Sequence, residues 1–252
     1  MEEKHIVLSD RLRMLTRMVT PGSRVADVGC DHGFLAIYLV QQEISAVVIA
    51  MDVRKGPLSA AREHVAAQGL GAYIETRLSD GLKELGPEEV DTVVCAGMGG
   101  RLMERILTES LDKAMQLKEL VLQPQSELQE FREFLRITGF YIADEDMVLE
   151  DGKYYFAMRA LPGSYHVIHV PEQIGREDYV RLCDKFGEKL LQGHHPILER
   201  YLRQQEKILE QLSEKLTGQV TERTNVRLRE ICQDLDDVRL ALKLFYRMAG
   251  HQ

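Results

Sequence analysis

The chain has 252 residues, 44% of them hydrophobic, and a formal net charge of −8. This length accommodates one large or two modest domains with a sizeable core, and the acidic balance argues against a protein that coats nucleic acid, although a local basic patch remains compatible with it. The longest apolar run, residues 46–51, is far shorter than the roughly 20 residues of a membrane span, so no membrane association is expected.

Short β-rich runs alternate with helical patterns over the first 160 residues. The predicted strands cover residues 24–29, 45–52, 72–77, 91–97 and 119–125, and the helical patterns between and after them include 34–43, 57–69, 100–111 and 127–139. This alternation indicates parallel β-α-β units, and the continuous hydrophobicity of the early strands agrees, because parallel strands are buried on both faces. Asp151-Gly152, between two β-like runs in residues 141–160, predicts a closing antiparallel hairpin. We therefore predict an α/β fold with a mostly parallel, Rossmann-like sheet.

The last part of the chain has a different periodicity. Apolar residues recur at steps of three and four over residues 198–216 and again over residues 228–245, with a glycine turn at 217–219 between them. Two such seams predict an antiparallel helical hairpin of the coiled-coil type. Gly163 and Pro171 bracket the boundary, so the predicted domains are residues 1–163 and 164–252.

The cysteines and histidines show no pattern typical of a redox or metal site. The four cysteines, Cys30, Cys95, Cys183 and Cys232, form no CxxC pair, and no signal peptide is recognisable. The simplest interpretation is reduced thiols in a cytoplasmic protein. The histidines lack the spacing of zinc ligands, so no metal is expected.

Acidic or glycine-rich turns follow each of the first four predicted strands. Because the carboxyl ends of parallel strands meet at one edge of the sheet, these turns should line one crevice. The residues expected there are Asp27, Gly29, Cys30, Asp31, His32, Gly33, Asp52, Val53, Ser79, Asp80, Gly81, Ala96, Gly97, Met98 and Gly99.

The first of these turns, DVGCDHG, indicates what kind of ligand the crevice would take. Gly29 and Gly33 lie four apart, so the GxGxxG pattern of dinucleotide sites is missing and a nicotinamide oxidoreductase is disfavoured. Asp27 and Asp31 would repel a diphosphate and suit a ligand with positive charge, such as an amino group or a sulfonium. The alternative for Asp31 is an ordinary strand-to-helix turn in which it caps the helix.

The other three turns suit a nucleoside. Asp52 could accept hydrogen bonds from both hydroxyls of a ribose, and Asp80 could accept one from an adenine amino group. The glycines of Ala96–Gly100 would let the backbone approach a planar ligand closely. The structural alternatives are a surface aspartate, an Asx turn with Gly81, and a flexible turn that caps the next helix.

Together these motifs resemble the S-adenosylmethionine sites of Rossmann-like methyltransferases. With LSDRL at residues 8–12, GKYYFAMRA at 152–160 and the helical tail, the chain resembles the bacterial tRNA adenine-22 N1-methyltransferase family over essentially its whole length. The resemblance implies S-adenosyl-L-methionine as cofactor, tRNA as partner, and methyl transfer to N1 of adenine 22. That family often has serine at Cys30 and alanine at Gly33, and neither difference removes a needed side chain.

The resemblance also implies a role for each turn. Asp27, Gly29, Asp31, His32 and Gly33 would flank the methionine part of the cofactor, and Asp52 would hold the ribose. Asp80 and Gly81 would hold the adenine, while Gly97, Met98 and Gly99 would position the reacting end. No catalytic side chain is identified, because the N1 lone pair needs no strong base. The absence of an Asn/Asp-Pro-Pro-aromatic loop favours a ring nitrogen over an exocyclic amine.

A target base in folded RNA must be unstacked to reach such a crevice. Tyr154 and Tyr155 could stack a base, although packing within the fold is the alternative. Candidate phosphate contacts are Arg11, Arg13, Arg17, Arg54, Lys55, Arg101 and Arg105, for which solvated helix faces are the alternative. The tail could recognise tRNA, recruit a protein partner or pair in a homodimer, and the oligomeric state stays open between a monomer and a weak homodimer.

Two other functions are compatible with the sequence. One is a methyltransferase that acts on a small molecule or protein, and the other is a cofactor-binding RNA chaperone or scaffold. A methyl-transfer assay with unmodified tRNA distinguishes them, because both alternatives predict no methyl incorporation into RNA.

Overall fold

The computed structural model describes residues 6–163, 168–217 and 222–249. It divides into two compact units, residues 1–167 and 168–252, and the division lies close to the expected boundary. The glycine turn predicted at 217–219 extends outside the described residues. Each unit is described by itself.

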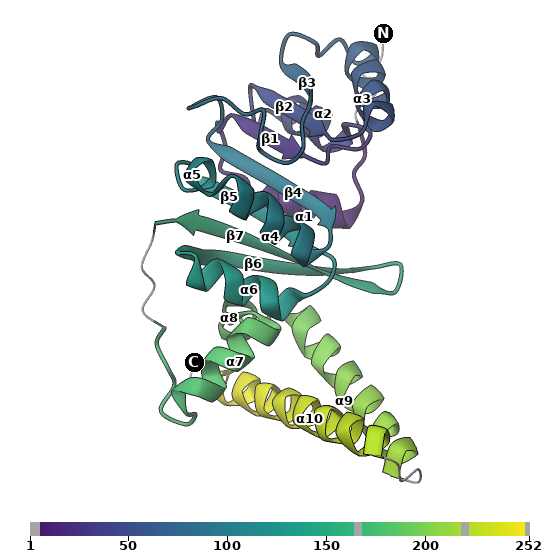
Figure 1. Cartoon of the computed structure of the whole chain (residues 1–252), viewed down its shortest axis with the longest axis vertical. Coiled ribbons are helices and arrows are strands. Elements are labelled where there is room, and N and C mark those ends of the chain that lie inside the picture. The colour runs from purple at the N-terminus through teal and green to yellow at the C-terminus, as the bar shows by residue number, and fades with distance from the viewer. Residues whose placement is uncertain (1–5, 164–167, 218–221, 250–252) are drawn as a thin grey trace. The chain divides into compact units, whose positions relative to one another are not determined.

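The first unit is built on a seven-stranded sheet with the order β3-β2-β1-β4-β5-β7-β6 (Figure 1). β1 to β5 run parallel to one another, β7 is antiparallel to β5, and β6 is antiparallel to β7. The predicted fold class is therefore confirmed. The strands are β1 Val25–Val28, β2 Val48–Asp52, β3 Ile74–Leu78, β4 Thr92–Met98, β5 Glu119–Pro124, β6 Phe140–Glu150 and β7 Lys153–Pro162.

Helices cover both faces of this sheet. They are α1 Asp10–Met18, α2 Phe34–Gln41, α3 Lys55–Ala67, α4 Gly100–Glu109, α5 Leu111–Ala114 and α6 Leu128–Ile137. α1, α2 and α3 contribute to one hydrophobic cluster, and α4, α5 and α6 to another. Neighbouring strand residues alternate between the two, as Val25 and Ala26 do. Both faces need apolar side chains, which is why the early strands read as continuous hydrophobic runs.

Two local features show how the sequence specifies the ends of these elements. Asp151 and Gly152 have φ angles of 49° and 76°, the left-handed pair that a two-residue hairpin turn requires. The predicted hairpin is therefore confirmed. α1 was not predicted as a helix, although its start carries a recognisable signal: the Ser9 hydroxyl accepts a hydrogen bond from the Leu12 amide at 3.4 Å.

The second unit contains α7 Arg176–Phe186, α8 Glu188–Gln192, α9 Pro196–Thr217 and α10 Glu222–Ala249. α9 and α10 form the expected helical hairpin (Figure 1). Leu198 and Leu202 of α9 are fully buried, whereas Leu212, nearer the turn, is 38% exposed. The seam is thus best packed at the end where α8 also contacts α10. The sequence did not predict α7 and α8, because neither continues a heptad pattern.

Candidate functional site

A cavity of about 540 Å³ opens at the carboxyl ends of β1 to β4. This volume lies within the usual range of small-molecule sites. Every residue predicted for the crevice lines the cavity except Gly33 and Gly99. Four turns that are widely separated in the sequence therefore meet, because β1 lies between β2 and β4 and the connections run to opposite sides of it.

The glycines set how closely these turns approach one another. Gly29 has φ +77°, and a Cβ placed on it would lie 2.2 Å from the Met98 Cε atom, so the turns after β1 and β4 are in contact. Gly33, with φ +73°, begins α2, and a Cβ there would lie 3.1 Å from α3. A Cβ on Gly99 would lie 2.9 Å from Ser126 Oγ. Gly33 and Gly99 therefore hold the backbone of the site and do not line it.

Asp31 does not cap α2. Gly33, which has no side chain, occupies the N-cap position, so α2 has no side-chain cap, while Asp31 has φ 49° and an exposed side chain on the cavity wall. The capping alternative for this aspartate is therefore wrong, because the turn places Asp31 two residues too early.

Asp27 is a buried carboxyl that has no hydrogen-bond partner among the described residues. It is 4% exposed, and its Oδ2 atom makes no hydrogen bond within the described structure. Burial, and secondarily the nearby Asp52, raises the pKa of Asp27 to about 7. An unpartnered buried oxygen is costly, so a ligand that brings a donor or a positive charge would relieve this cost. The residues present thus fit a cationic ligand.

Asp52, at the end of β2, is also buried and is firmly held. Its Oδ1 atom accepts the backbone N–H of Arg54 at 2.8 Å, and the Arg54 guanidinium lies 3.6 Å away. Its Oδ2 atom makes no hydrogen bond to a described residue. A fixed carboxylate with an oxygen left over suits a diol such as a ribose.

The turn after β3 is closed by its own hydrogen bonds. The Ser79 hydroxyl donates to the Gly81 carbonyl at 2.8 Å. Asp80 forms ion pairs with Lys83 at 2.6 Å and Arg105 at 3.3 Å, and these neighbours lower the pKa of Asp80. Ser79 therefore shapes the turn, and Asp80 is held as a carboxylate on the cavity wall.

Two aromatic rings at the cavity edge, Phe34 and His64, were not predicted from the sequence, and they lie beside His32, which was. Phe34 stacks on His64 with ring centroids 4.9 Å apart, and His32 lies 5.7 Å from Phe34. The His64 Nδ1 atom is within 2.9 Å of the His32 carbonyl oxygen. His32 and Phe34 line the cavity. Only the tertiary structure brings His64 to this place, from the last turn of α3.

Arg11 and Gln125 complete the wall beside the turn after β4. The Arg11 Nη1 atom donates to the Gln123 Oε1 atom at 3.0 Å, and the guanidinium carbon lies 5.4 Å from the centre of the Tyr155 ring. Arg11 is therefore fixed at the cavity. Tyr155 packs against the hydrophobic cluster beneath it, as its alternative interpretation held.

The remaining candidate phosphate contacts fall into three groups. Arg54 and Arg105 line the cavity. Arg13 and Arg17 form ion pairs with Asp10 at 3.6 Å and Asp146 at 3.1 Å, away from it. The other two, Lys55 and Arg101, are exposed and form no hydrogen bond or ion pair through their side chains with a residue that the structure describes.

No helix within the described ranges is long and apolar enough to cross a membrane. The same residues contain no group of three or more His, Cys, Asp or Glu side chains that could hold a metal ion.

Comparison with known proteins assigns the family. A methyltransferase domain model matches residues 8–158. A crystal structure from Streptococcus pneumoniae, of a candidate tRNA (m1A22) methyltransferase, is 30% identical, has a TM-score of 0.80, and is matched over 94% of this chain and 100% of that one. The chain belongs to the tRNA (adenine-22-N1)-methyltransferase family.

Two further relatives of this methyltransferase bear on its ligand and substrate. The tRNA (adenine(22)-N(1))-methyltransferase of Bacillus subtilis is 35% identical over 156 residues, which span 62% of this chain and 66% of that protein's length. A second structure of the S. pneumoniae protein, in complex with S-adenosyl-L-methionine, has a TM-score of 0.78 and 28% identity over 94% of this chain and 100% of that one.

The cysteines of this methyltransferase near the site are not poised as nucleophiles. Burial raises the pKa of the Cys30 thiol, and it raises the pKa of Cys95 to about 12. Both thiols are protonated at neutral pH, and a thiol is a poor nucleophile compared with its thiolate. A direct transfer that uses no enzyme-bound intermediate is consistent with this chemistry.

Asp27 should make folding of the ligand-free methyltransferase depend on pH. Between the ordinary pKa of 3.8 and the raised value of about 7, the folded protein holds a proton that the unfolded chain has lost. The contribution of Asp27 to the free energy of unfolding is therefore fully present below about pH 4 and lost as the pH rises to about 7. We expect Asp27→Asn to become more stable relative to wild type across this window, by up to a few kcal/mol. Denaturant unfolding of both proteins at pH 5, 6.5 and 8 measures the difference in their free energies of unfolding. A difference that stays constant over this pH range would contradict the prediction.

Proposed function

We propose that this protein transfers the methyl group of S-adenosyl-L-methionine to N1 of adenine 22 in tRNA. One observation carries the proposal: two buried carboxyl groups, on the ends of adjacent strands, line a single cavity, and each has an oxygen that makes no hydrogen bond to a described residue. The family to which the chain belongs and the S-adenosyl-L-methionine complex of its relative support the same ligand.

In this proposal the cofactor extends along the edge of the sheet. The adenine lies beside Asp80 and Gly81 after β3, and the ribose hydroxyls donate to Asp52 after β2. The charged methionine end lies against the turn from Asp27 to Gly33 after β1. Its reacting end then reaches Gly97 and Met98 after β4, where Gly29 allows the two turns to touch.

The protein's contribution to chemistry is mainly positioning and electrostatics. In the transfer, the N1 lone pair of adenine displaces the thioether from the methyl carbon, so the C–S bond breaks, its electron pair stays on sulfur, and the positive charge passes to the adenine ring. No proton has to be removed from N1 beforehand. The chain therefore has to hold the ring in line with the methyl group and to keep water out.

A methyl-transfer assay with unmodified tRNA tests this proposal. Incorporation into RNA, with the modified base mapped as N1-methyladenine at position 22, is the expected result. Tight cofactor binding without incorporation into RNA would instead favour a small-molecule or protein substrate, or a scaffold.

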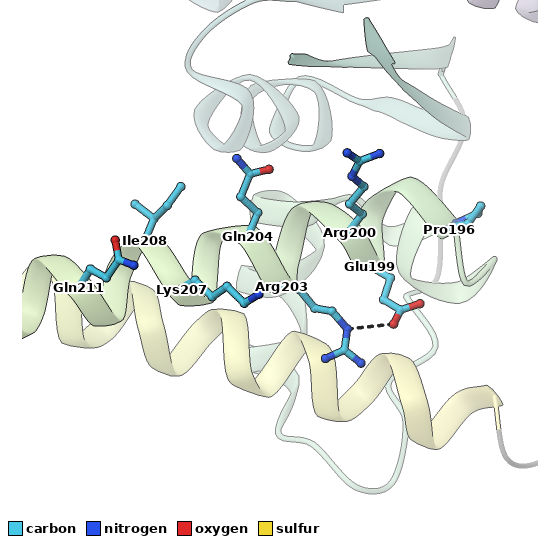
Figure 2. Close-up of a pocket in the computed structure, with 8 residues that line it drawn as sticks. All are labelled: Pro196, Glu199, Arg200, Arg203, Gln204, Lys207, Ile208 and Gln211. Atoms are coloured by element: carbon cyan, nitrogen blue, oxygen red, sulfur yellow. Dashed lines mark hydrogen bonds and ion pairs between the residues drawn. The ribbon is translucent and has the colours of Figure 1, made fainter. Parts of the chain in front are cut away.

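The second unit is the proposed site of tRNA recognition, through one face of α9. Figure 2 shows Arg200, Gln204 and Ile208 projecting from the side of α9 away from α10. The acidic residues of α9 are largely neutralised within the hairpin: Arg239 of α10 binds Glu206 at 3.3 Å and Glu210 at 2.7 Å.

Two cations of α9 form no ion pair within the described residues. Glu199 is held by Arg203 at 3.0 Å and by the Tyr246 hydroxyl, whereas Arg200 and Lys207 have no acidic partner in the part of the chain that the structure describes. These two lie seven residues apart, about 10 Å along the helix. The second unit has about as many acidic as basic residues. It can still bind phosphate if the acidic side chains are held in ion pairs within the unit and some of the basic ones are not.

Reversing these two charges should weaken tRNA binding specifically. We expect Arg200→Glu with Lys207→Glu to reduce tRNA affinity by at least 10-fold at low salt and to lower the slope of log affinity against log salt by about 1.5, because two phosphate contacts are lost. Arg229→Glu with Lys243→Glu on α10 makes the same change in net charge and serves as the control. Salt titrations of binding measure both pairs, and an equal loss in the two would contradict the assignment.

A further inference from the structure

Gln125 stands at the next position along the edge of the sheet beyond the cofactor site. It follows β5, the neighbour of β4, and its backbone N–H donates to the Met98 carbonyl at 2.8 Å. Its side chain is exposed, lines the cavity and makes no hydrogen bond to a described residue. A free amide is thus held beside the end where the methyl group would be presented.

Two polar side chains come close to Gly97, which has no side chain of its own. A Cβ on Gly97 would be 3.8 Å from the Gln125 Nε2 atom and 3.6 Å from the Arg11 Nη1 atom. Arg11 is tied down by Gln123 and stacked over Tyr155. The missing side chain of Gly97 therefore leaves a slot bordered by a fixed guanidinium and by an amide that makes no hydrogen bond to a described residue.

We infer that Gln125 recognises the target adenine through its N6 amino group and N7. The inference rests on the proposed function. An amide is the side-chain group that pairs with this edge of adenine, with its oxygen accepting from N6–H and its nitrogen donating to N7. Such pairing leaves N1 free, whereas a contact to the Watson–Crick edge would block the reacting atom. Guanine would present O6 to the amide oxygen, two acceptors facing each other, so the same contact selects adenine.

Arg11 has a supporting part in this arrangement. Its guanidinium is already paired with Gln123, so it forms one wall of the slot and orients the incoming nucleotide without approaching N1. This placement matters because the methylated ring is cationic, and a mobile positive charge at N1 would oppose the transfer.

The experiment pairs an enzyme variant with a substrate analogue. Gln125→Ala and Gln125→Glu are assayed on tRNA that carries either adenine or 7-deazaadenine at position 22, with Gln42→Ala, an exposed glutamine at the far end of α2, as the control. We expect wild type and Gln42→Ala to lose about 10-fold or more in kcat/KM on the analogue. Both Gln125 variants should lose a similar factor on normal tRNA and almost nothing further on the analogue.

The possible results distinguish a failure of this inference from a failure of the proposed function. Cofactor affinity within twofold of wild type shows that the Gln125 variants are folded and that the loss lies in base recognition. Full activity of Gln125→Ala, or losses from variant and analogue that multiply, would overturn the role of Gln125 while leaving the proposed function intact. A wild-type protein that does not methylate adenine N1 in tRNA would overturn the proposed function as well.

Discussion

Replacing Asp52 with alanine should weaken S-adenosyl-L-methionine binding by about 100-fold. Hydrogen bonds to a charged acceptor contribute about 1.5–3 kcal/mol each, and tenfold in affinity corresponds to about 1.4 kcal/mol. Asp52 is 5% exposed, so its hydrogen bonds to a bound ligand would be largely shielded from solvent. Titration calorimetry on the purified protein measures the change.

Asp52→Asn separates ligand binding from turn structure. The Oδ1 atom of Asp52 accepts the Arg54 amide at 2.8 Å, and asparagine can keep that bond. We expect this variant to retain the folding stability of wild type and still to bind the cofactor about 10-fold less tightly, because the charge is lost. Near-unchanged affinity in both variants would contradict the ribose assignment.

Removing residues 171–252 should reduce the rate of tRNA methylation by at least 100-fold and leave cofactor affinity unchanged. Both hydrophobic clusters that cover the sheet are made only of residues from the first unit, and so is the lining of the cavity. The first unit therefore has what it needs to fold and to bind a small ligand. The unpaired cations on α9 are lost with the second unit.

Calorimetry and methyl transfer on the same shortened protein measure the two effects. Retained cofactor affinity serves as the control for folding. A shortened protein that methylates tRNA at the wild-type rate would remove the second unit from substrate recognition.

The sequence was most informative about backbone positions. Once the sheet is parallel, residues that follow the strands, such as Gly29 and those after Asp52, must lie at the same edge of the sheet. Asp27, Gly29 and Asp52 line the cavity there, as expected. The hairpin turn at Asp151-Gly152 was equally predictable, since few residue pairs accept two positive φ angles.

What the sequence could not supply were pairings between distant side chains. Arg105 was predicted to contact phosphate, but the structure joins it to Asp80, which lies 25 residues away. His64 reaches the cavity edge only because α3 packs beside the turn after β1. Gln125 carries no local signal, and its interest depends on β5 being the neighbour of β4. Such contacts depend on the order of the strands and the packing of the helices. The pattern of apolar residues predicts the elements and the fold class, but not which distant side chains meet.

A crystal structure of the protein with bound S-adenosyl-L-methionine is the most direct test of the central claim. We expect the ribose on Asp52, the adenine beside Gly81, and the sulfonium methyl group between Gly97 and Gln125, facing the slot for the target base. A cofactor bound outside this cavity, or one whose methyl group points away from Gly97, would contradict it.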